Sequence, residues 1–534
     1  MPVLETRIDP ESAAFRANAE AMEAEVAGFR AIEAAVNAAA ETARARYEKR
    51  GNLMPQDRLA LLLDRGSPFL ELSSLAGYRM FDDKDGTGAG AGCIAGIGFV
   101  AGVRCMVIVD NFAVKGGTIT PVGLQKKLRS QEIARENKLP IITLAQSGGA
   151  NLAHAAEMFV TGGRAFANQA RLSAMGIPQI TVVHGSATAG GAYQPGLSDY
   201  IVMVRGQATT YLAGPPLLKA ATGEIATDEE LGGAEMHTQV SGVGDYLAEN
   251  DADGIRLARE IMGSLGWTEQ AGVLAFDEPE YPAEELIGVV PADPKEPYDC
   301  REIIARIADG SAFLDFKPEY DAQTICGHAK IAGHPVGIIG NNGPITAQGA
   351  AKGGQFIQLC EQSGLPILFF HNITGFLVGT DPEQAGIIKH GSKMIQAVAN
   401  ARVPKISINV GGSYGAGNYA MCGRGFDPRF LFSWPNSRTA VMGGAQAGMV
   451  LRMVAEAKMA KAGAVDEAAL ATLEELTRVQ MESQTTALAS TARMEDDGLI
   501  DPRDTRRILA FVLEICSAAE KRALRPNTFG IARF

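Results

Sequence analysis

Short apolar segments alternate with amphipathic segments along most of the chain. Runs such as "PIITLA" and "PQITVV" are short and β-branched, which is typical of buried strands. Between such runs the helical period predicts helices over Val122–Asn137, Gly162–Met175, Gly349–Ser363 and Ile387–Ala401. Strands that alternate with helices indicate parallel sheets built from crossover units, so the pattern predicts an α/β protein. Ahead of it, the alanine- and glutamate-rich stretch Ala13–Arg50 predicts one or two exposed helices, an arm that packs on a neighbour or on the domain surface.

The same order of elements occurs twice. "ENKLPIITLAQSGG" has a partner in "EQSGLPILFFHNITG", in which Pro140 matches Pro366. "GIPQITVVHG" and "RVPKISINVG" match through Pro178 and Pro404, which are separated by the same interval as the first pair of prolines. A looser echo, with a small slip, joins "VIVDNFAVKGGT" to "GIIGNNGPITAQG". Repetition at one fixed interval predicts two homologous domains in tandem.

A proline-rich acidic segment, Phe276–Asp299, separates the two halves. It contains five prolines, including Pro294, and is expected to be an extended linker. The predicted organisation is therefore an N-terminal domain with the helical arm (1–275), a linker (276–299) and a C-terminal domain (300–534).

A loop of small residues follows the matched strands of each half. In the first half it is "HGSATAGGAYQPG", with Gly190 and Gly191; in the second half "GGSYGAGNYAMCG" has Ala416 and Gly417 at the matching positions. N–H groups at a helix start have no partner within the helix and lie at the positive end of its dipole. Because glycine lets a ligand atom approach the backbone closely, such a loop suits a developing oxyanion. The sequence predicts two oxyanion holes, Gly190 with Gly191 and Ala416 with Gly417.

Other interpretations compete with this one. The glycines also permit close helix–strand packing. Ser413 fits the nucleophile-elbow pattern Gly-x-Ser-x-Gly of hydrolases, but its counterpart in the first half is Ala187 and no triad partners are placed by pattern. Ser147-Gly148-Gly149 is either a second backbone contact for a ligand or an ordinary turn. His184 and His371 end strands near the loops and are expected to be hydrogen-bonded structural residues.

Composition narrows the function. The formal net charge of −12 argues against a nucleic-acid partner, and no apolar run is long enough for a membrane span. The N-terminus has no signal- or transit-peptide pattern, and seven scattered cysteines without CxxC pairs suggest reduced thiols in a cytoplasm, which we expect to be bacterial. No zinc or other metal site is readable.

Several longer segments carry a resemblance. They are "SGGANL", "FANQARLSAMGIPQI", "TAGGAY", "LAGPPLLKAATGE", "NNGPI", "NITGF", "GGSYGAGNYAMCGR", "FSWPNSR" and "VMGGAQA". In this order, over nearly the whole chain, they resemble the carboxyltransferase (β) subunits of biotin-dependent acyl-CoA carboxylases, above all those acting on methylcrotonyl-CoA and geranyl-CoA. The resemblance implies two crotonase-like domains in tandem.

The resemblance also implies a reaction, transfer of CO2 from carboxybiotin to the γ-carbon of a branched α,β-unsaturated acyl-CoA. Gly190 and Gly191 would hold the thioester oxygen, and Ala416 and Gly417 the biotin ureido oxygen. The residues expected around these holes are Ser147, Gly148, Gly149 and Ala189 on the substrate side, and Thr374, Gly375, Phe376, Tyr414 and Gly415 on the biotin side.

The choice of acyl group rests on one difference between this sequence and the methylcrotonyl-type pattern. The methylcrotonyl-type pattern has an aromatic residue where this chain has Gly162, and Ala165 is also small. Loss of an aromatic side chain frees ~150–250 Å² of contact surface, so geranyl-CoA is preferred to 3-methylcrotonyl-CoA, the substrate in leucine degradation. The alternatives are a propionyl-CoA or other acyl-CoA carboxyltransferase, a decarboxylase or transcarboxylase running the transfer in reverse, and a non-catalytic scaffold.

The chain contains no Ala-Met-Lys-Met biotin attachment site and no ATP-grasp portion. The resemblance therefore implies an α subunit with biotin carboxylase and biotin carboxyl carrier domains. It further implies a homohexameric β core in an α6β6 assembly, in which the two holes of one site come from different subunits.

Overall fold

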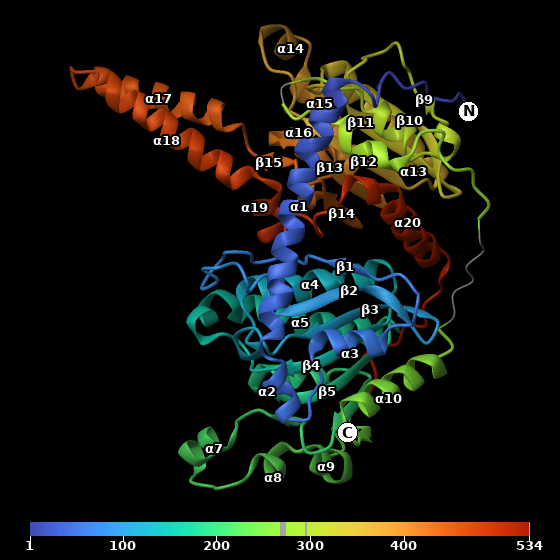
Figure 1. The fold of residues 1–534 in the computed structure, drawn as a ribbon, viewed down its shortest axis with the longest axis vertical. Coiled ribbons are helices and arrows are strands. Elements are labelled where there is room, and N and C mark those ends of the chain that lie inside the picture. Colours follow the sequence, from blue (N-terminus) through green and yellow to red (C-terminus); the bar gives the residue numbers. More distant parts are fainter. Residues whose placement is uncertain (268–273, 294–295, 533–534) are drawn as a thin grey trace. The chain divides into compact units, whose positions relative to one another are not determined.

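The computed structural model describes residues 1–267, 274–293 and 296–532 and contains two compact units (Figure 1). Pro294, inside the expected linker, lies outside the described residues. Unit 1 consists of Met1–Arg30, Val273–Thr491 and Glu495–Glu514, and unit 2 of Ala31–Gly272, Ala492–Met494 and Ile515–Phe534. Each unit has its own sheet with helices packed against it, which confirms the α/β class.

Unit 2 contains an eight-stranded sheet in the order β1-β2-β3-β4-β5-β6-β8, with β7 paired to β5. β1, β2 and β3 are antiparallel neighbours, and the pairs from β3 to β8 are parallel. All eight residues of β3 and all seven of β4 are buried, as expected of central strands covered on both faces. The strands are β1 (Leu70–Leu72), β2 (Cys93–Val100), β3 (Val103–Asp110), β4 (Ile141–Ser147), β5 (Gln179–Thr188), β6 (Tyr200–Val204), β7 (Thr209–Tyr211) and β8 (Tyr246–Ala248).

The helices of unit 2 cover this sheet. α3 and α10 share one apolar core with alternate residues of the central strands, among them Ile180 and Val182. α4 and α5 pack on one another and contact β3 and β5. The helices are α2 (Arg44–Lys49), α3 (Pro55–Leu62), α4 (Pro121–Glu136), α5 (Ala155–Ala174), α6 (Tyr193–Gly196), α7 (Pro215–Thr222), α8 (Asp228–Gly232), α9 (Ala234–Met236) and α10 (Asp251–Ser264).

Unit 1 repeats this sheet without the last strand. Its order is β14-β13-β12-β11-β10-β9, with β15 paired to β13. The strands are β9 (Leu314–Asp315), β10 (Thr324–Ile331), β11 (His334–Asn341), β12 (Ile367–Ile373), β13 (Lys405–Tyr414), β14 (Phe430–Ser433) and β15 (Arg438–Ala440).

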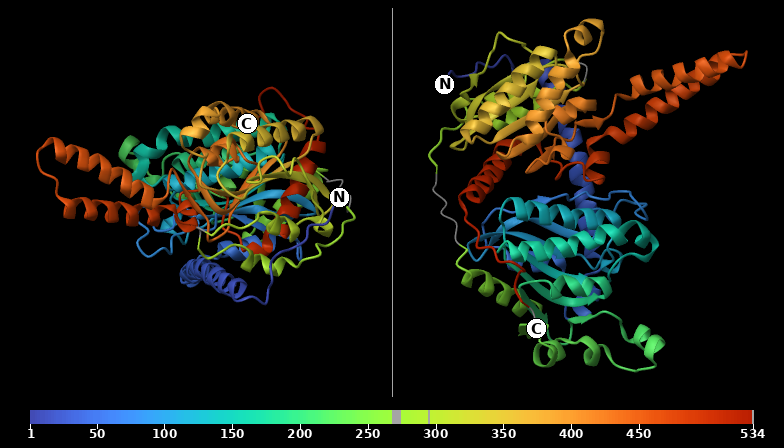
Figure 2. Two further views of the ribbon diagram at one scale, coloured as in Figure 1. Left: turned by 90° about the horizontal axis from the view of Figure 1, so that it is seen from above. Right: turned by 180° about the vertical axis from the view of Figure 1, so that it is seen from behind.

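α13 and α15 of unit 1 pack together, and α17 and α18 lie side by side as a hairpin (Figures 1 and 2). α1 (Ala13–Glu41) and α20 (Thr505–Lys521) each contribute residues to both units. The other helices are α11 (Leu286–Val289), α12 (Arg301–Ala305), α13 (Ala347–Ser363), α14 (Thr380–Gln384), α15 (Ile387–Asn400), α16 (Gly415–Ala420), α17 (Gly444–Lys461), α18 (Glu467–Thr485) and α19 (Ala487–Ala492).

The structure confirms the duplication at the level of register. β4 and β12, and likewise β5 and β13, have the same lengths and begin at the interval that separates Pro140 from Pro366. The pairing of β4 with β5 shifts register and continues at Ser147–Ala187. The pairing of β12 with β13 shifts in the same way and continues at Ile373–Ser413, so both shifts occur at positions separated by the interval of the repeat. The repeat therefore extends from the sequence to the pairing of individual residues.

The predicted helices match the observed ones with one main difference. α4, α13 and α15 begin and end within two residues of the predicted limits, whereas α5 begins at Ala155 instead of Gly162. Two adjacent glycines each cost a helix about 1 kcal/mol relative to alanine, which made Gly162 look like a helix start. Packing of Met158, which is only 4% exposed, accounts for the earlier start.

Part of the segment expected to be an extended linker packs as an element of unit 1. A 3-10 turn (Ala283–Glu285) leads into α11, whose four residues are all buried. The prolines and acids led to the expectation of a linker, but the apolar "LIGVV" between them buries its side chains within unit 1.

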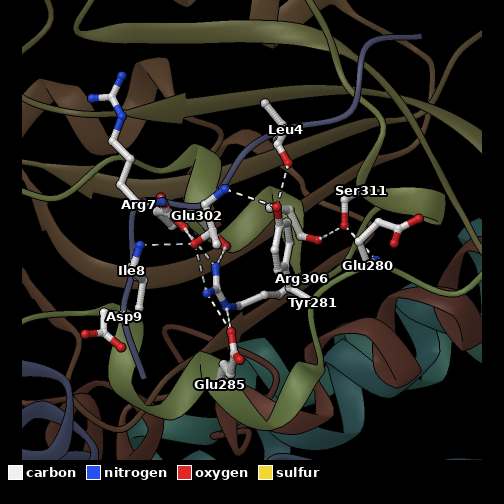
Figure 3. Close-up of polar contacts among 12 residues, drawn as sticks. Leu4, Arg7, Ile8, Asp9, Glu280, Tyr281, Glu285, Glu302, Arg306 and Ser311 are labelled. Atoms are coloured by element: carbon white, nitrogen blue, oxygen red, sulfur yellow. Dashed lines mark hydrogen bonds and ion pairs between the residues drawn. The ribbon is translucent and has the colours of Figure 1, made fainter. Parts of the chain in front are cut away.

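The first residues of the chain also belong to unit 1, whereas residues 1–275 were expected to form one domain. Val3 pairs with Ala312 in an antiparallel bridge. Figure 3 shows the polar contacts around buried Arg306, whose guanidinium donates to Glu285 at 2.7 Å and to Glu302 at 2.9 Å. Glu302 in turn accepts from the backbone N–H of Arg7 at 2.8 Å and from the hydroxyl of Thr6 at 2.6 Å.

The same network includes Tyr281, whose hydroxyl accepts from the N–H of Thr6 and donates to the carbonyl of Leu4, both at 3.2 Å. Because Arg306 also donates to Thr6, these bonds hold the N-terminal segment against residues up to 300 positions further along the chain.

The cysteines and the helix lengths were also read from the sequence. All seven cysteines are buried as thiols outside disulfides. Within the described residues, every helix is too short or too polar to cross a bilayer.

Candidate functional site: two matched loops of small residues

The first loop begins where β5 ends. Ala189, Gly190 and Gly191 form the first residues of a 3-10 turn that continues into α6. Ala189 and Gly190 are exposed, and their turn position leaves the N–H groups of Gly190 and Gly191 without an acceptor inside the turn. Ala189 has a φ of +53°, a left-handed conformation that is strained for a residue with a Cβ. Its counterpart in the second half, Gly415, has the same φ of +53°.

The second loop begins where β13 ends, and α16 starts at Gly415. Ala416 is exposed, Gly417 is buried, and both lie in the first turn of the helix. The N–H groups of Ala416 and Gly417 thus occupy the same turn positions as those of Gly190 and Gly191.

The space around the glycines separates their two possible roles. A Cβ added at Gly191 would meet nothing within 4 Å, and one at Gly190 would only touch Phe166 at 3.9 Å. A Cβ at Gly417 would instead lie 2.7 Å from Ile373 Cγ1 and 3.0 Å from Gly375 Cα. Close packing therefore accounts for Gly417 but leaves Gly190 and Gly191 unexplained.

Beside each of these two loops lies a neighbouring loop, at the end of the adjacent strand. Gly149 (φ +81°) follows β4, and Gly375 (φ +125°) follows β12. The carbonyl of Gly149 accepts from Ile119 N–H at 2.9 Å, and that of Gly375 from Ile345 N–H at 3.0 Å, so this hydrogen bond is repeated at the interval of the duplication. A Cβ at Gly149 would lie 3.4 Å from the carbonyl oxygen of Thr188, so the loop after β4 contacts the loop after β5.

The hydroxyl of Ser147 forms hydrogen bonds within the loop that follows β4. It donates to the carbonyl of Gly117 at 2.9 Å and accepts from the N–H of Gly149 at 3.2 Å, and it is buried. Gly148 is exposed beside it. The side chain of Ser147 thus holds this turn together, and Gly148 lies at the surface beside the first loop.

α5 supplies side chains next to the first loop. Phe166 lies beside Gly190 and meets Tyr193 edge-to-face with ring centroids 5.8 Å apart. Gly162 is one helical turn earlier on the same face, is partly buried, and an added Cβ would meet nothing within 4 Å. Ala165 uses its carbonyl to accept from Gln131 at 3.0 Å. The sequence did not single out Phe166 or Tyr193, although the i, i+4 spacing from Gly162 to Phe166 is the signal that could have found the former.

A buried polar network supports the end of β5. Nδ1 of His184 lies 2.8 Å from Oδ1 of Asp251, and Arg58 donates to Oδ2 of Asp251 at 3.0 Å and to Gln146 at 2.7 Å. Burial, with the charge of Arg58, lowers the pKa of His184 to about 4 although the bond to Asp251 opposes this. His184 is therefore neutral at pH 7, and the expectation of a structural role is confirmed.

The hydrolase interpretation fails at Ser413. Its side chain is fully buried, and its hydroxyl oxygen lies 2.8 Å from both His371 Nδ1 and Asn418 Nδ2. Burial lowers the pKa of His371 to about 4. A nucleophile elbow must expose its serine, so Ser413 is a structural residue that ties β13 to β12 and α16.

On the other side of β13, a cavity of about 160 Å³ lies within unit 1. Its lining includes Thr374, Tyr414, Gly412 and Arg438. Burial raises the pKa of Tyr414 although Arg438 opposes the shift, so the phenol is neutral at pH 7. Gly375 and Phe376 follow Thr374, and Phe376 bridges Ile345 as Ala150 bridges Ile119.

Within the described residues, no group of three or more His, Cys, Asp or Glu is arranged to hold a metal ion.

Two sheets that share the same strand order apart from β8, each with the same pair of loops at its strand ends, define a duplicated tandem α/β protein. Residues 46–529 match the carboxyl transferase domain family. The chain belongs to this family.

Proteins similar to this chain include β subunits of acyl-CoA carboxylases. A crystal structure of the geranyl-CoA carboxylase β subunit of P. aeruginosa is 64% identical, covers 100% of both chains and superposes with a TM-score of 0.94. A Mycobacterium tuberculosis biotin-dependent 3-methylcrotonyl-coenzyme A carboxylase β1 subunit is 49% identical over 90% of this chain and 91% of its own. A probable mitochondrial methylcrotonoyl-CoA carboxylase β chain of Drosophila melanogaster is 45% identical over 99% and 95%.

This chain is accordingly the carboxyltransferase component of a biotin-dependent acyl-CoA carboxylase, and it requires a biotin-carrying partner. The names of its relatives divide between geranyl-CoA and 3-methylcrotonyl-CoA.

Proposed function

We propose that this chain transfers CO2 from carboxybiotin on a partner α subunit to the γ-carbon of geranyl-CoA. The observation that carries the choice of acyl group is the open space at Gly162, on the face of α5 that leads to Gly190. The 64% identity to a geranyl-CoA carboxylase β subunit supports it. 3-Methylcrotonyl-CoA is the second candidate, because relatives that carry its name align over nearly the whole chain.

In the proposed reaction the first loop binds the thioester. Loss of a γ-proton from an α,β-unsaturated thioester gives a conjugated dienolate whose charge ends on the thioester oxygen. The N–H groups of Gly190 and Gly191 are fixed donors at the start of a turn, and such donors stabilise a charge as it forms. Their lack of side chains leaves the approach open.

The second loop binds the biotin ureido oxygen through the N–H groups of Ala416 and Gly417. The neighbouring cavity of about 160 Å³, with the neutral phenol of Tyr414 and the exposed Thr374 in its lining, is the proposed place of the uncharged bicyclic ring of biotin. When bound, the carboxylated ring supplies CO2 and then a basic ureido nitrogen. The chain itself orients the ring and stabilises the ureido oxygen.

The partner is proposed to be an α subunit with biotin carboxylase and biotin carboxyl carrier domains, and the assembly an α6β6 complex around a homohexameric β core in a bacterial cytoplasm. In this proposal the acyl-CoA hole of one subunit faces the biotin hole of another. Mixing two inactive variants, Gly191→Val and Ala416→Val, should then restore activity that neither has alone. Mixtures that stay inactive would count against shared sites.

The substrate is tested with the complex reconstituted from this chain and its α subunit, by comparing kcat/KM for geranyl-CoA and 3-methylcrotonyl-CoA. Gly162→Phe should shift the preference toward the shorter substrate by about 10- to 200-fold, the range for one apolar pocket wall. Gly163→Phe is the matched control, because Gly163 is exposed on the same helix and an added Cβ there also meets nothing within 4 Å. Equal effects of the two variants would contradict the pocket.

A further inference from the structure

One of the differences between the two halves is a loop next to the site. Between β3 and α4 the chain has ten residues, 111–120, whereas between β11 and α13 it has five, 342–346. The strands before these loops match in length, and the bridges Ile119–Ala150 and Ile345–Phe376 after them match as well. The five extra residues therefore lie within 111–118, and only in the half to which the acyl-CoA is assigned.

The extra residues form a left-handed turn. Lys115, Gly116 and Gly117 have φ values of +47°, +65° and +70°. Lysine in this conformation costs about 1–2 kcal/mol, so the surrounding structure must hold it there. It does so through Gly117, whose carbonyl accepts from the hydroxyl of Ser147 at 2.9 Å and from the N–H of Gly148 at 3.2 Å. The turn is thereby fixed to the loop that contacts the first oxyanion hole.

Four exposed cations lie on this loop and on the chain segment that contacts it. Lys115 is exposed at its start, and the guanidinium of Arg50 lies 5.9 Å from the ring centroid of Phe112, in the same loop. Arg46 and Lys49 are exposed on α2, one turn apart. Among the described residues none of the four has an ion pair. A cluster of unpaired positive charge is notable in a chain with a net charge of −12.

We propose that Lys115, together with Arg46, Lys49 and Arg50, binds the phosphate groups of the coenzyme A portion of the substrate. The inference rests on the proposed acyl-CoA function and adds the residues that recognise the nucleotide end. Unpaired Lys and Arg side chains are the usual partners of phosphate. The other half, assigned to biotin, receives a group without phosphate and lacks both the extra residues and the left-handed turn.

Lys115 permits a substitution that removes charge without adding strain. Glycine adopts a φ of +47° readily, so Lys115→Gly should leave the fold intact or more stable, which thermal unfolding checks. Lys115→Arg retains the charge. Lys330→Gln, at an exposed lysine on β10 in unit 1, is the control for loss of one positive charge elsewhere.

The experiment compares CoA and pantetheine thioesters of the same acyl group in the reconstituted carboxylase. Lys115→Gly should raise KM for the CoA thioester about tenfold with kcat unchanged, and leave KM for the pantetheine thioester unchanged. Lys115→Arg should restore KM, and higher salt should reduce the difference between wild type and Lys115→Gly. Equal changes for the two thioesters, or no change for either, would overturn the inference.

Calorimetric titration separates this inference from the proposed function. Free CoA should bind the wild-type chain more tightly than Lys115→Gly, whether or not geranyl-CoA is carboxylated. Inorganic phosphate that binds as tightly as CoA, or CoA that binds both chains equally, would overturn the inference. If CoA binding follows the prediction but no acyl-CoA is carboxylated, the phosphate site stands and the proposed reaction fails.

Discussion

Valine substitutions at the two matched glycines should separate chemistry from folding. At Gly191 an added Cβ meets nothing within 4 Å, so valine fits the chain but fills the space in front of the loop. At Gly417 the Cβ would lie 2.7 Å from Ile373 and 3.0 Å from Gly375 Cα, and overpacking of this kind costs about 1–3 kcal/mol. Valine is thus expected to lower activity alone at Gly191, and to lower both activity and stability at Gly417.

The magnitude follows from the role of the N–H donors. Loss of one oxyanion-hole donor lowers kcat by about 10²- to 10³-fold, or roughly 2.7–4 kcal/mol. Gly191→Val should reach this range while keeping the wild-type unfolding temperature. Gly417→Val should lower kcat at least as much and should also lower the unfolding temperature of unit 1.

Steady-state carboxylation by the reconstituted complex, paired with thermal unfolding of the isolated β chain, measures the two quantities. Gly196→Val is the matched control, because Gly196 ends α6 five residues further on and an added Cβ there also meets nothing within 4 Å. Near-wild-type kcat for Gly191→Val would refute the assignment of this loop, and equal loss at Gly196 would show that the effect is not specific to the hole.

Three further results are expected. Because the pKa of His184 falls from 6.5 to about 4 on folding, its contribution to the free energy of unfolding is complete above pH 6.5, and up to about 3 kcal/mol is lost as the pH falls toward 4. His184→Gln should reduce the difference in free energy of unfolding between pH 7 and pH 5, measured by urea unfolding. Ala189→Gly should raise the unfolding temperature and Gly415→Ala should lower it, because both positions have a φ of +53°; shifts of the same sign in calorimetry would contradict the strain. Glu302→Gln should destabilise unit 1 by about 1–3 kcal/mol in denaturant unfolding, because buried Arg306 loses an anionic partner; the exposed Glu319→Gln should not.

Local pattern was sufficient for most of the fold. The strands β4, β5, β12 and β13 are short, apolar and bounded by proline or glycine, so their period and their repetition at one interval predicted both sheets. The helix α5 was predicted late because Gly162 lowers local helix propensity while the compensating burial of Met158 is a tertiary effect.

The contacts that sequence did not predict are long-range or conformational. The pairing of Val3 with Ala312 joins the start of the chain to its second half, and no local pattern encodes it. The left-handed turns at Ala189 and Lys115 involve residue types that seldom adopt that conformation, so neither residue signalled it. The candidate site was predicted where glycine marked the backbone and was incomplete where it depended on Phe166, which only the fold brings to Gly190.

Comparison of the two loops bears on why glycine is present at each. In the second loop Gly415 relieves a left-handed turn, and Gly417 admits the neighbouring strand end, so the fold alone accounts for both. In the first loop the left-handed position is held by Ala189 at a cost of about 1 kcal/mol or more, while the two following residues are glycines in open space. If glycine served only the backbone there, it would be expected at 189 and would be dispensable at 190 and 191. The observed arrangement is the reverse, and an approaching substrate oxygen, which a Cβ would obstruct, accounts for it.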